Sequence, residues 1–339
     1  TLEGDVTPVA SPVGGVTIGR PYASGSFSAS AEGTIAFTEG RPDRPAEVAV
    51  AKFRGEQPPR TLTRLNEDLL GHKQLGDVQE FRFAASVDER EIQSWIVTPP
   101  DFDPSKKYPL ILEIHGGPFA NYGPRFSAEV QLYAAAGYVV LYVNPRGSTG
   151  YGEEFGNLIH HAYPGDDYHD LMSAVDAVLA EGYVDEDQLY VTGGSGGGIL
   201  TAWIVGQTDR FRAAVAAKPV INWYSFVLTT DGYPFFNEYW FPGYPWEHSE
   251  HYLKRSPLAY VGNVTTPTML MTGEVDYRTP ISESEQFYQA LQLRKIDTAL
   301  VRVPGSSHNI AARPSHLMSK AAHVLKWFEM HSGRGAMDP

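Results

Sequence analysis

The sequence predicts an α/β protein whose centre is a mostly parallel sheet of eight strands. Short, continuous apolar runs recur from about residue 80 onwards, and parallel strands that are buried on both faces have this pattern. Amphipathic helical segments alternate with the runs, which indicates crossovers that cover both faces of one sheet. A glycine-rich stretch, GGSGGG (193–198), joins one run directly to an apolar helix, so a sharp turn is expected there.

Composition and charge exclude several classes of protein. The 339-residue chain is 42% apolar and 20% charged, as expected of an ordinary globular protein, and it has no apolar run near the ~18 residues of a membrane-spanning helix. Acidic residues outnumber basic ones by 40 to 27, and the formal net charge of −13 argues against nucleic acid or an anionic membrane as a partner. Cysteine is absent, which excludes thiol catalysis and zinc–thiolate sites. A cytoplasmic location is expected, with a removed signal peptide as the alternative.

The first part of the chain resembles pieces of an antiparallel sheet. Residues 26–40 alternate around a glycine turn in the manner of a hairpin, residues 46–53 form another strand candidate, and residues 62–77 suggest a linker with some helical content. We therefore expect a partial β segment with its linker over 1–75 and the main domain over 76–335.

The main domain begins with EFRFAASV (80–87) and EIQSWIV (91–97), which form a hairpin-like antiparallel pair. Six later apolar runs have the character of buried parallel strands; they lie at 110–115, 138–144, 188–194, 213–218, 268–273 and 298–304. Two helices carry apolar side chains on one face; these are 167–181 (Leu171, Val175, Val178, Leu179) and 315–330 (Leu317, Ala321, Val324, Leu325, Phe328).

The glycine-rich turn fits neither common phosphate-binding motif. A P-loop needs Lys followed by Ser or Thr after its last glycine, but Ile199 and Leu200 stand there. The dinucleotide fingerprint also fails, because its third glycine would fall at Ile199. The pattern that fits is G-x-S-x-G between a strand and a helix, with Ser195 at its centre.

A serine in such a turn is a candidate nucleophile. The sharp turn strains its backbone and lifts its hydroxyl above the sheet. The N–H of Gly196 then points into the positive field at the start of a helix, where an oxyanion can bind. A purely structural glycine turn is the alternative.

A serine nucleophile needs a base, and the base needs an orienting acid, in the chain order Ser, Asp or Glu, His. Asp276 and His308 each follow a predicted strand directly, at the edge of the sheet where ligands bind. Glu274 is the runner-up acid. Other candidates lack the strand-then-loop setting, namely His248, His251, His316, His323, Asp209, Asp231 and Asp297.

The stretch EIHGGPFANYG (113–123) supplies a second oxyanion donor. A His-Gly-Gly turn after a strand lets backbone N–H groups face the nucleophile, and Gly117 is the expected donor. A plain tight turn is the alternative, and His115 is expected to be structural.

Taken together, these residues resemble the prolyl oligopeptidase family of serine peptidases, and within it the acylaminoacyl-peptidase branch. The resemblance covers residues 60–330, and the matching stretches are WIVTPPDFDPSKKYPLILEIHGGP, VNPRGSTGYGEEF, VTGGSGGG, GEVDYRTP and PGSSHNI. It implies an α/β-hydrolase fold that cleaves short, often N-acylated peptides or related esters and amides. It also implies that Arg278 holds a substrate carbonyl, with a salt bridge to Glu274 as the alternative.

The sequence departs from the family pattern in two places. The family usually has an aromatic residue after the nucleophile, where this chain has Gly196, so one wall of the pocket is lost. Family members also carry a β-propeller over the site, whose blades take about 40–50 residues each. The region 1–75 holds less than two blades, so the chain is a natural short form or a fragment. A homo-oligomer or a separate propeller chain is the expected partner.

Two further segments carry candidate chemistry. Residues 221–252 are rich in aromatic side chains and interrupt the strand–helix rhythm, so we expect them to fold over the site, with Trp223, Phe226 and Trp240 lining an apolar pocket. Simple packing is the alternative. The stretch HHAYPGDDYHD (160–170) is better explained by a turn and helix N-cap than by a metal site, and no metal or cofactor is expected.

The sequence therefore predicts a serine hydrolase that cleaves short, N-acylated peptides through an acyl-enzyme. A carboxylesterase with the same three residues is the first alternative, because both activities use the same chemistry. A hydrolase-fold interaction module with an unused serine is the second.

Overall fold

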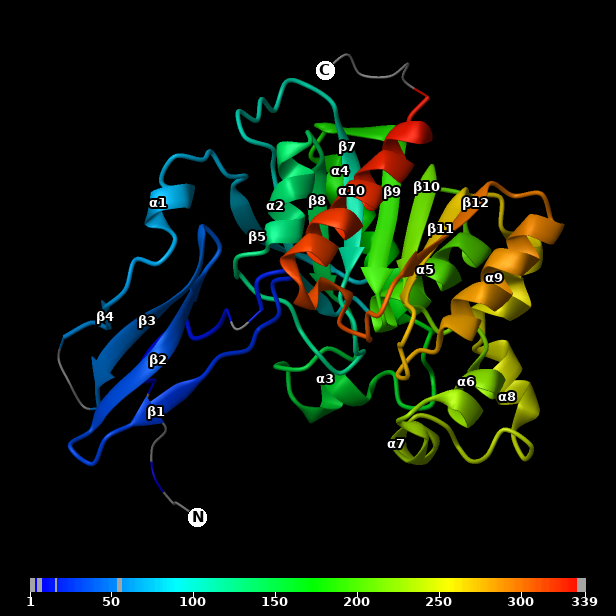
Figure 1. Cartoon of the computed structure of the whole chain (residues 1–339), viewed down its shortest axis with the longest axis horizontal. Coiled ribbons are helices and arrows are strands. Elements are labelled where there is room, and N and C mark those ends of the chain that lie inside the picture. Colours follow the sequence, from blue (N-terminus) through cyan, green and yellow to red (C-terminus); the bar gives the residue numbers. More distant parts are fainter. Residues whose placement is uncertain (1–3, 5–7, 16, 54–56, 334–339) are drawn as a thin grey trace.

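An eight-stranded sheet forms the centre of the computed structural model, which describes residues 4, 8–15, 17–53 and 57–333. Its strand order is β12-β11-β10-β9-β7-β8-β6-β5 (Figure 1). The strands are β5 (Val78–Ala84), β6 (Glu91–Val97), β7 (Tyr108–Ile114), β8 (Val139–Asn144), β9 (Val184–Gly194), β10 (Ala213–Ala217), β11 (Thr268–Gly273) and β12 (Thr298–Val303). Only the pairs β5–β6 and β6–β8 are antiparallel. The predicted α/β-hydrolase fold with a mostly parallel sheet is confirmed.

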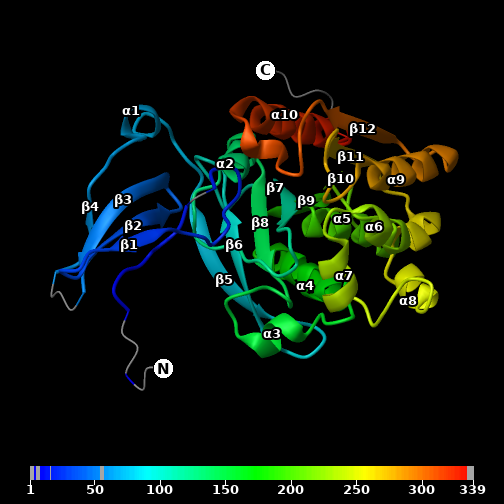
Figure 2. The same ribbon diagram turned by 60° about the horizontal axis from the view of Figure 1, so that its bottom comes forward.

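Helices cover both faces of this sheet (Figure 2). On one face lie α4 (Asp167–Ala180), α5 (Gly196–Gln207) and α9 (Ile281–Leu293), whose buried side chains include Leu171, Leu200 and Phe287. On the other face lie α2 (Ala128–Ala135) and α10 (Pro314–Met330), which bury Val130 and Phe328 against the strands. The two predicted amphipathic helices correspond to α4 and α10. Short elements complete this part of the chain, namely α3 (Glu153–Asn157), η1 (Pro257–Asn263) and η2 (Ile310–Ala312).

The aromatic segment between β10 and β11 forms three short helices. These are α6 (Trp223–Thr229), α7 (Tyr233–Tyr239) and α8 (Ser249–Lys254). They lie beyond the carboxyl ends of the parallel strands (Figure 1), which is where a segment must lie if it is to line a site at those ends.

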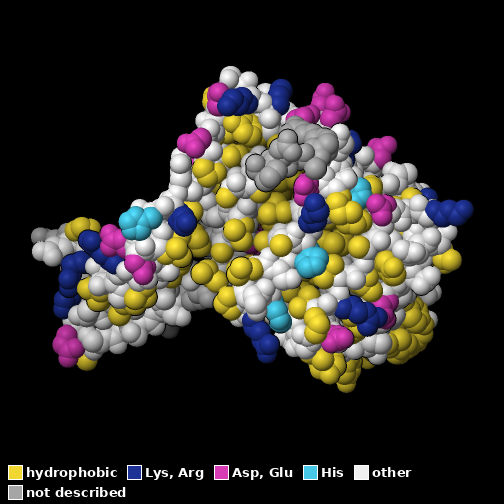
Figure 3. Space-filling view, turned by 45° about the horizontal axis from the view of Figure 1, so that its top comes forward, with side chains coloured by type: hydrophobic (Ala, Val, Ile, Leu, Met, Phe, Trp, Pro, Cys, Tyr) yellow, Lys and Arg dark blue, Asp and Glu magenta, His cyan; other side chains and the backbone are white. Residues whose placement is uncertain are grey.

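A smaller antiparallel sheet stands beside the α/β body, and in Figure 3 it protrudes as a separate lobe. It contains β1 (Phe27–Ala29), β2 (Thr34–Arg41), β3 (Arg44–Lys52) and β4 (Arg60–Thr61), and α1 (Glu67–Leu70) follows in the linker. The predicted hairpin is the β1–β2 pair, in register at Phe27 and Phe37. On the face drawn in Figure 3, acidic and basic side chains are interspersed, so that face offers no continuous basic surface for nucleic acid.

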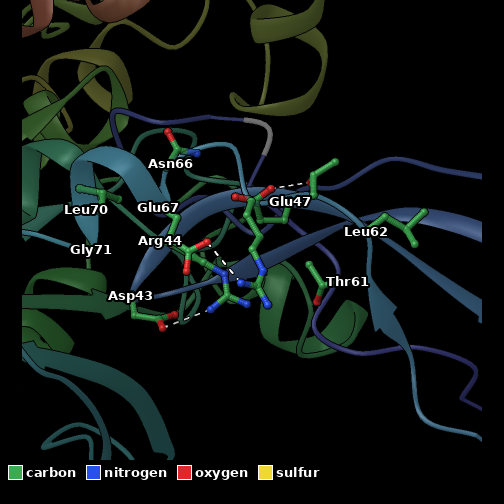
Figure 4. A pocket seen from close by; sticks show the side chains of 11 residues that line it. Asp43, Arg44, Glu47, Thr61, Leu62, Asn66, Glu67, Leu70 and Gly71 are labelled. Carbon is green, nitrogen blue, oxygen red and sulfur yellow. Dashed lines mark hydrogen bonds and ion pairs between the residues drawn. The ribbon is translucent and has the colours of Figure 1, made fainter.

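A cavity of about 700 Å³ lies between β3 and the linker (Figure 4). Its charged side chains pair mostly with one another: Arg44 bonds with Asp43 at 3.4 Å, and Arg64 with Glu67 at 3.4 Å. None of the predicted site residues lines it. Among the described residues, no helix combines the length and apolar character needed to cross a bilayer.

Candidate active site

The turn at Ser195 is a strained strand-to-helix junction. β9 ends at Gly194, α5 begins at Gly196, and Ser195 between them has φ 60° and ψ −119°, a region that residues with a Cβ rarely occupy. Close packing explains the flanking glycines: a Cβ on Gly193 would lie 2.4 Å from Gly197 O, and a Cβ on Gly197 would lie 2.0 Å from the carbonyl oxygen of Ile114. The G-x-S-x-G pattern is therefore a steric requirement of this turn.

Ser195, His308 and Asp276 form one chain of hydrogen bonds. Ser195 Oγ lies 3.0 Å from His308 Nε2, and His308 Nδ1 lies 2.8 Å from Asp276 Oδ2. Asp276 comes from the loop after β11 and His308 from the loop after β12, as the sequence predicts. Asp276 is further fixed by the N–H of Thr279 and the N–H of Arg278, which donate to its Oδ1 at 2.9 and 3.0 Å.

Burial and hydrogen bonding set the protonation states of Asp276 and His308. Burial acts to raise the pKa of Asp276, but the hydrogen bonds and charge of His308 and the bonds from Thr279 outweigh it, so the pKa falls below the usual aspartate value. Burial is also the main influence on His308; it lowers the pKa, with further lowering from Lys218, against the opposing effect of Asp276. At neutral pH the imidazole is therefore neutral, with Nδ1–H donating to Asp276 and Nε2 free to accept the serine proton.

Two backbone N–H groups beside Ser195 are available to an oxyanion. Gly196 is the first residue of α5, and Gly117 lies in the turn after β7 with φ +126°. A Cβ on Gly196 would meet Gly117 N at 2.9 Å, so the two backbones are adjacent. Within the described residues, neither N–H donates a hydrogen bond to a protein acceptor. This is the condition of a preorganised oxyanion hole.

His115 has the structural role that was expected. It is buried, its Nδ1 lies 2.8 Å from Gly116 O, and its Nε2 lies 2.9 Å from Ser148 Oγ. Burial lowers the pKa of His115 to about 4, so the ring is neutral. Because a carbonyl oxygen can only accept, Nδ1 carries the proton and donates to Gly116 O, while Nε2 faces the Ser148 hydroxyl, which also lies 2.7 Å from Pro145 O.

The aromatic segment contains exposed rings, such as Tyr233 and Trp246, as well as partly and fully buried ones. Trp240 and Phe119 line a small cavity beside Tyr163, with a volume of about 10 Å³. Trp223 and Phe226, expected to line the pocket, are fully buried instead; the Trp223 ring packs edge-on behind Trp240 at 5.7 Å. These two rings therefore support the pocket wall from within the core.

Arg278 lies in the loop that carries Asp276, and its side chain pairs with Asp231 and not with Glu274. Its Nε donates to Asp231 Oδ1 at 2.6 Å, and both side chains are 48% exposed. The alternative of a salt bridge to Glu274 is wrong: the Glu274 carboxylate accepts from Gly305 N at 3.3 Å instead. Asp276, not the runner-up Glu274, bonds to His308. The exposed guanidinium remains accessible to a substrate carbonyl.

Two residues near the nucleophile were missed by the sequence reasoning. Tyr163 donates from its hydroxyl to Gly196 O at 2.8 Å, and Lys218 donates from Nζ to His308 O at 2.6 Å. Lys218 ends the run 213–218 at the carboxyl edge of the sheet, and this position was a usable signal. No sequence feature indicated the contact of Tyr163, because this residue approaches the turn from a loop that is distant in the sequence.

The stretch 160–170 forms a turn ahead of α4. Asp167 accepts from Gly165 N at 2.6 Å and from Tyr168 N at 3.0 Å, and Asp170 pairs with Arg146 at 2.8 Å. The expected N-cap bond is absent at the cap residue, Asp166. Over the described part of the chain, no three His, Asp or Glu side chains are grouped so that they could hold a metal ion.

Comparison with known proteins finds matches over most of the chain. The sequence profile of the prolyl oligopeptidase family matches residues 124–335. The uncharacterized peptidase YuxL of Bacillus subtilis is 40% identical over 294 residues, which is 86% of this chain and 44% of YuxL.

Two solved structures are also similar. The acylaminoacyl peptidase of Pyrococcus horikoshii superimposes with a TM-score of 0.85 at 28% identity, over 93% of this chain and 50% of that one. An acylaminoacyl peptidase in complex with Z-Gly-Gly-Phe-chloromethyl ketone gives a TM-score of 0.84 at 28% identity, over 94% of this chain and 52% of that one. The chain thus spans about half the length, or less, of these similar proteins.

Proposed function

The chain belongs to the prolyl oligopeptidase family, and from this premise we propose that it is a serine peptidase that cleaves short, N-acylated peptides through an acyl-enzyme. The observation that carries the proposal is the hydrogen-bonded chain Ser195–His308–Asp276 beside two unpaired backbone N–H groups. The similarity to acylaminoacyl peptidases supports N-acylated peptides as the substrate class.

The geometry supports the following steps. His308 Nε2 takes the hydroxyl proton as Ser195 Oγ attacks the scissile carbonyl, 3.0 Å being a hydrogen-bond distance suited to this transfer. Asp276 stabilises the imidazolium that results, and the N–H groups of Gly196 and Gly117 bind the oxyanion. Collapse expels the amine, which takes the proton from His308. Water, activated by the same imidazole, then releases the acyl group and restores Ser195.

Substrate recognition is proposed on two sides of the nucleophile. Arg278 would hold a substrate carbonyl with the part of its guanidinium that Asp231 leaves exposed. The exposed ring of Phe119, next to the turn that carries Gly117, would contact an apolar side chain or acyl group at the surface, because the cavity that it lines with Trp240 is too small to hold one. Trp223 and Phe226 would act only by supporting Trp240.

A carboxylesterase with the same three residues is the second candidate. The described residues contain one four-stranded sheet ahead of the α/β body, and one sheet of this size does not close a ring over the site. An open approach would admit bulky aryl esters. No described strand pairs with the outer edges of β1 and β4, so we propose that a second copy or a further propeller chain pairs there.

We also propose a domain boundary close to residue 75. The small sheet has a core of its own around Phe37, Ala49 and Ala51, while the strands of the large sheet begin at Val78. The boundary separates the two sheets but not every contact, because residues ahead of β1 pack against the α/β body.

Labelling and substrate competition test the proposal together. A fluorophosphonate probe should label Ser195 and no other serine, and Ser195→Ala should abolish labelling. We expect kcat/KM for acyl-peptides to exceed that for the matching unacylated peptides and for short acyl esters. Esters preferred over acyl-peptides would favour the carboxylesterase, and labelling at another serine would reject the assignment of the nucleophile.

A length series separates an open site from a gated one. Acyl-peptides of increasing length and esters of increasing bulk should be turned over without a sharp cutoff if the small sheet leaves the site open. A sharp cutoff would show that access to the site is restricted, and light scattering would then show whether a second subunit is present to restrict it.

A further inference from the structure

The segment ahead of the small sheet packs against the α/β body. Residues 17–24 run beside the loop that follows β7 and reach the start of α2 (Figures 1 and 2). Ala23 N donates to Asn121 O at 3.0 Å, and Gly123 N donates to Pro21 O at 3.0 Å, so the two segments pair in antiparallel fashion. This pairing fixes residues 17–24 against the oxyanion loop, which we define as residues 115–123.

Tyr22 brings its hydroxyl to the middle of the oxyanion loop. The N–H of Gly116 donates to Tyr22 Oη at 2.7 Å. A Cβ built on Gly116 would meet that oxygen at 3.0 Å and Ser195 Cβ at 3.3 Å, so the hydroxyl lies close to the nucleophile's turn. Burial raises the pKa of Tyr22, and the phenol therefore stays neutral over the working pH range.

The two peptide groups that flank the Gly116 Cα are thus each held by a hydrogen bond with a side chain. Tyr22 accepts from the N–H of the first, and His115 Nδ1 donates to the carbonyl oxygen of the second at 2.8 Å. The second peptide group is the one that carries the N–H of Gly117. The direction of this N–H therefore depends on two bonds, one of which comes from outside the oxyanion loop.

Tyr22 is itself held firmly. Its ring packs edge-on against Tyr122, with the centroids 4.8 Å apart. Two residues earlier, the buried Arg20 pairs with Glu113 at 2.8 Å and with Glu129 at 3.3 Å. Glu129 also bonds to Lys320 of α10 at 2.5 Å, so a buried ion cluster anchors the segment.

We propose that Tyr22 is a positioning residue for the oxyanion hole. The inference rests on the proposed function, in which Gly117 N–H stabilises the transition state. Such a donor acts only when it lies 2.7–3.1 Å from the developing oxyanion, and a small misplacement is costly. Loss of one restraining hydrogen bond should therefore lower kcat by about tenfold, with less effect on ground-state binding.

The test compares Tyr22→Phe with Tyr190→Phe. Both changes remove only a hydroxyl. Tyr190 is a suitable control because it is buried on β9, five residues before Ser195. Its Oη donates to Gln188 Oε1 at 2.7 Å. For each variant we would measure the fraction of sites titrated by a fluorophosphonate, kcat and KM for an acyl-peptide anilide, and the Ki of a peptidyl trifluoromethyl ketone, whose hemiketal oxygen occupies the oxyanion hole.

For Tyr22→Phe we expect a fully titratable site, kcat lower by about tenfold, KM within about twofold, and the ketone Ki higher by about tenfold. The acid limb of the pH profile should not move, because His308 is untouched. Tyr190→Phe should match the unmodified chain in all kinetic values.

Three results would overturn the inference: an unchanged kcat, a fall explained by fewer titratable sites, or a rise in KM alone. Ser195→Ala, run in parallel, separates the two levels of the argument. If Ser195→Ala kept its activity, the proposed function and the role of Tyr22 would both fall. If it were inactive while Tyr22→Phe turned over at the full rate, only the role of Tyr22 would fall.

Discussion

Replacing Ser195 by glycine should leave the protein more stable than replacing it by alanine. Ser195 has φ 60° and ψ −119°, and a residue with a Cβ pays about 1–3 kcal/mol to occupy such a region. Glycine avoids that cost but loses about 0.5–1 kcal/mol more conformational entropy on folding. Both variants lack the hydroxyl and its bond to His308, so their difference isolates the Cβ.

The net advantage of Ser195→Gly over Ser195→Ala should be about 1 kcal/mol, or about 2 °C in Tm for a domain of this size. Differential scanning calorimetry measures it directly. The exposed helical residue Ser319 on α10 serves as a control, because there glycine should be less stable than alanine by about 1 kcal/mol.

If Ser195→Gly proved no more stable than Ser195→Ala, while the Ser319 pair behaved as expected, the turn would not be strained. Both Ser195 variants should also lose nearly all turnover, on the order of 10⁶-fold, as expected when a nucleophile of this kind is removed.

Activity should fall on the acid side with a midpoint below the ~6.5 of an ordinary histidine, because burial lowers the pKa of His308 and the base must be neutral to act; a midpoint above that value in a pH profile of kcat/KM would contradict this. Gly197→Ala should destabilise the fold by at least about 1–3 kcal/mol, because its Cβ would lie 2.0 Å from a carbonyl oxygen of β7; Gly156→Ala, with open space around its Cβ, is the control in the same denaturation experiment. Arg278→Ala should raise KM for acyl-peptides by about tenfold, and Asp231→Asn, which keeps the guanidinium, should raise it less. An unchanged KM in the arginine variant would remove Arg278 from the substrate site.

The features that could be predicted from the sequence depend on local pattern and chain order. Continuous apolar runs located β7 to β12, because parallel strands with buried faces leave that mark, and the hairpin-like pair located β5 and β6. Ser195, Asp276 and His308 were found because each follows a strand, and parallel strands bring their carboxyl ends to one edge. The glycines of the turn were found for a similar reason, as the close approach of backbones excludes a side chain.

The features that were missed depend on contacts between distant segments. Residues 17–24 have no apolar period, so nothing local indicated that Arg20 and Tyr22 pack against the α/β body. Glu113, near the carboxyl end of a buried strand, was a signal that a cation must approach from elsewhere. Proximity in the sequence suggested Glu274 as an ion-pair partner of Arg278, whereas the turn after α6 brings Asp231 to the guanidinium. Aromatic identity alone did not separate Trp240, at the cavity, from the buried Trp223.

The buried ion cluster around Arg20 also limits how the protein can be dissected. An excised catalytic fragment that begins near residue 76 would keep both sheet faces and all three residues of the Ser195–His308–Asp276 chain. It would nevertheless lose Arg20 and leave Glu113 and Glu129 with Lys320 as their remaining cation. Removing one partner from a buried ion pair costs about 3–5 kcal/mol. The α/β body therefore depends on residues 17–24, which precede the small sheet in the sequence. Truncated variants of the protein should keep this segment.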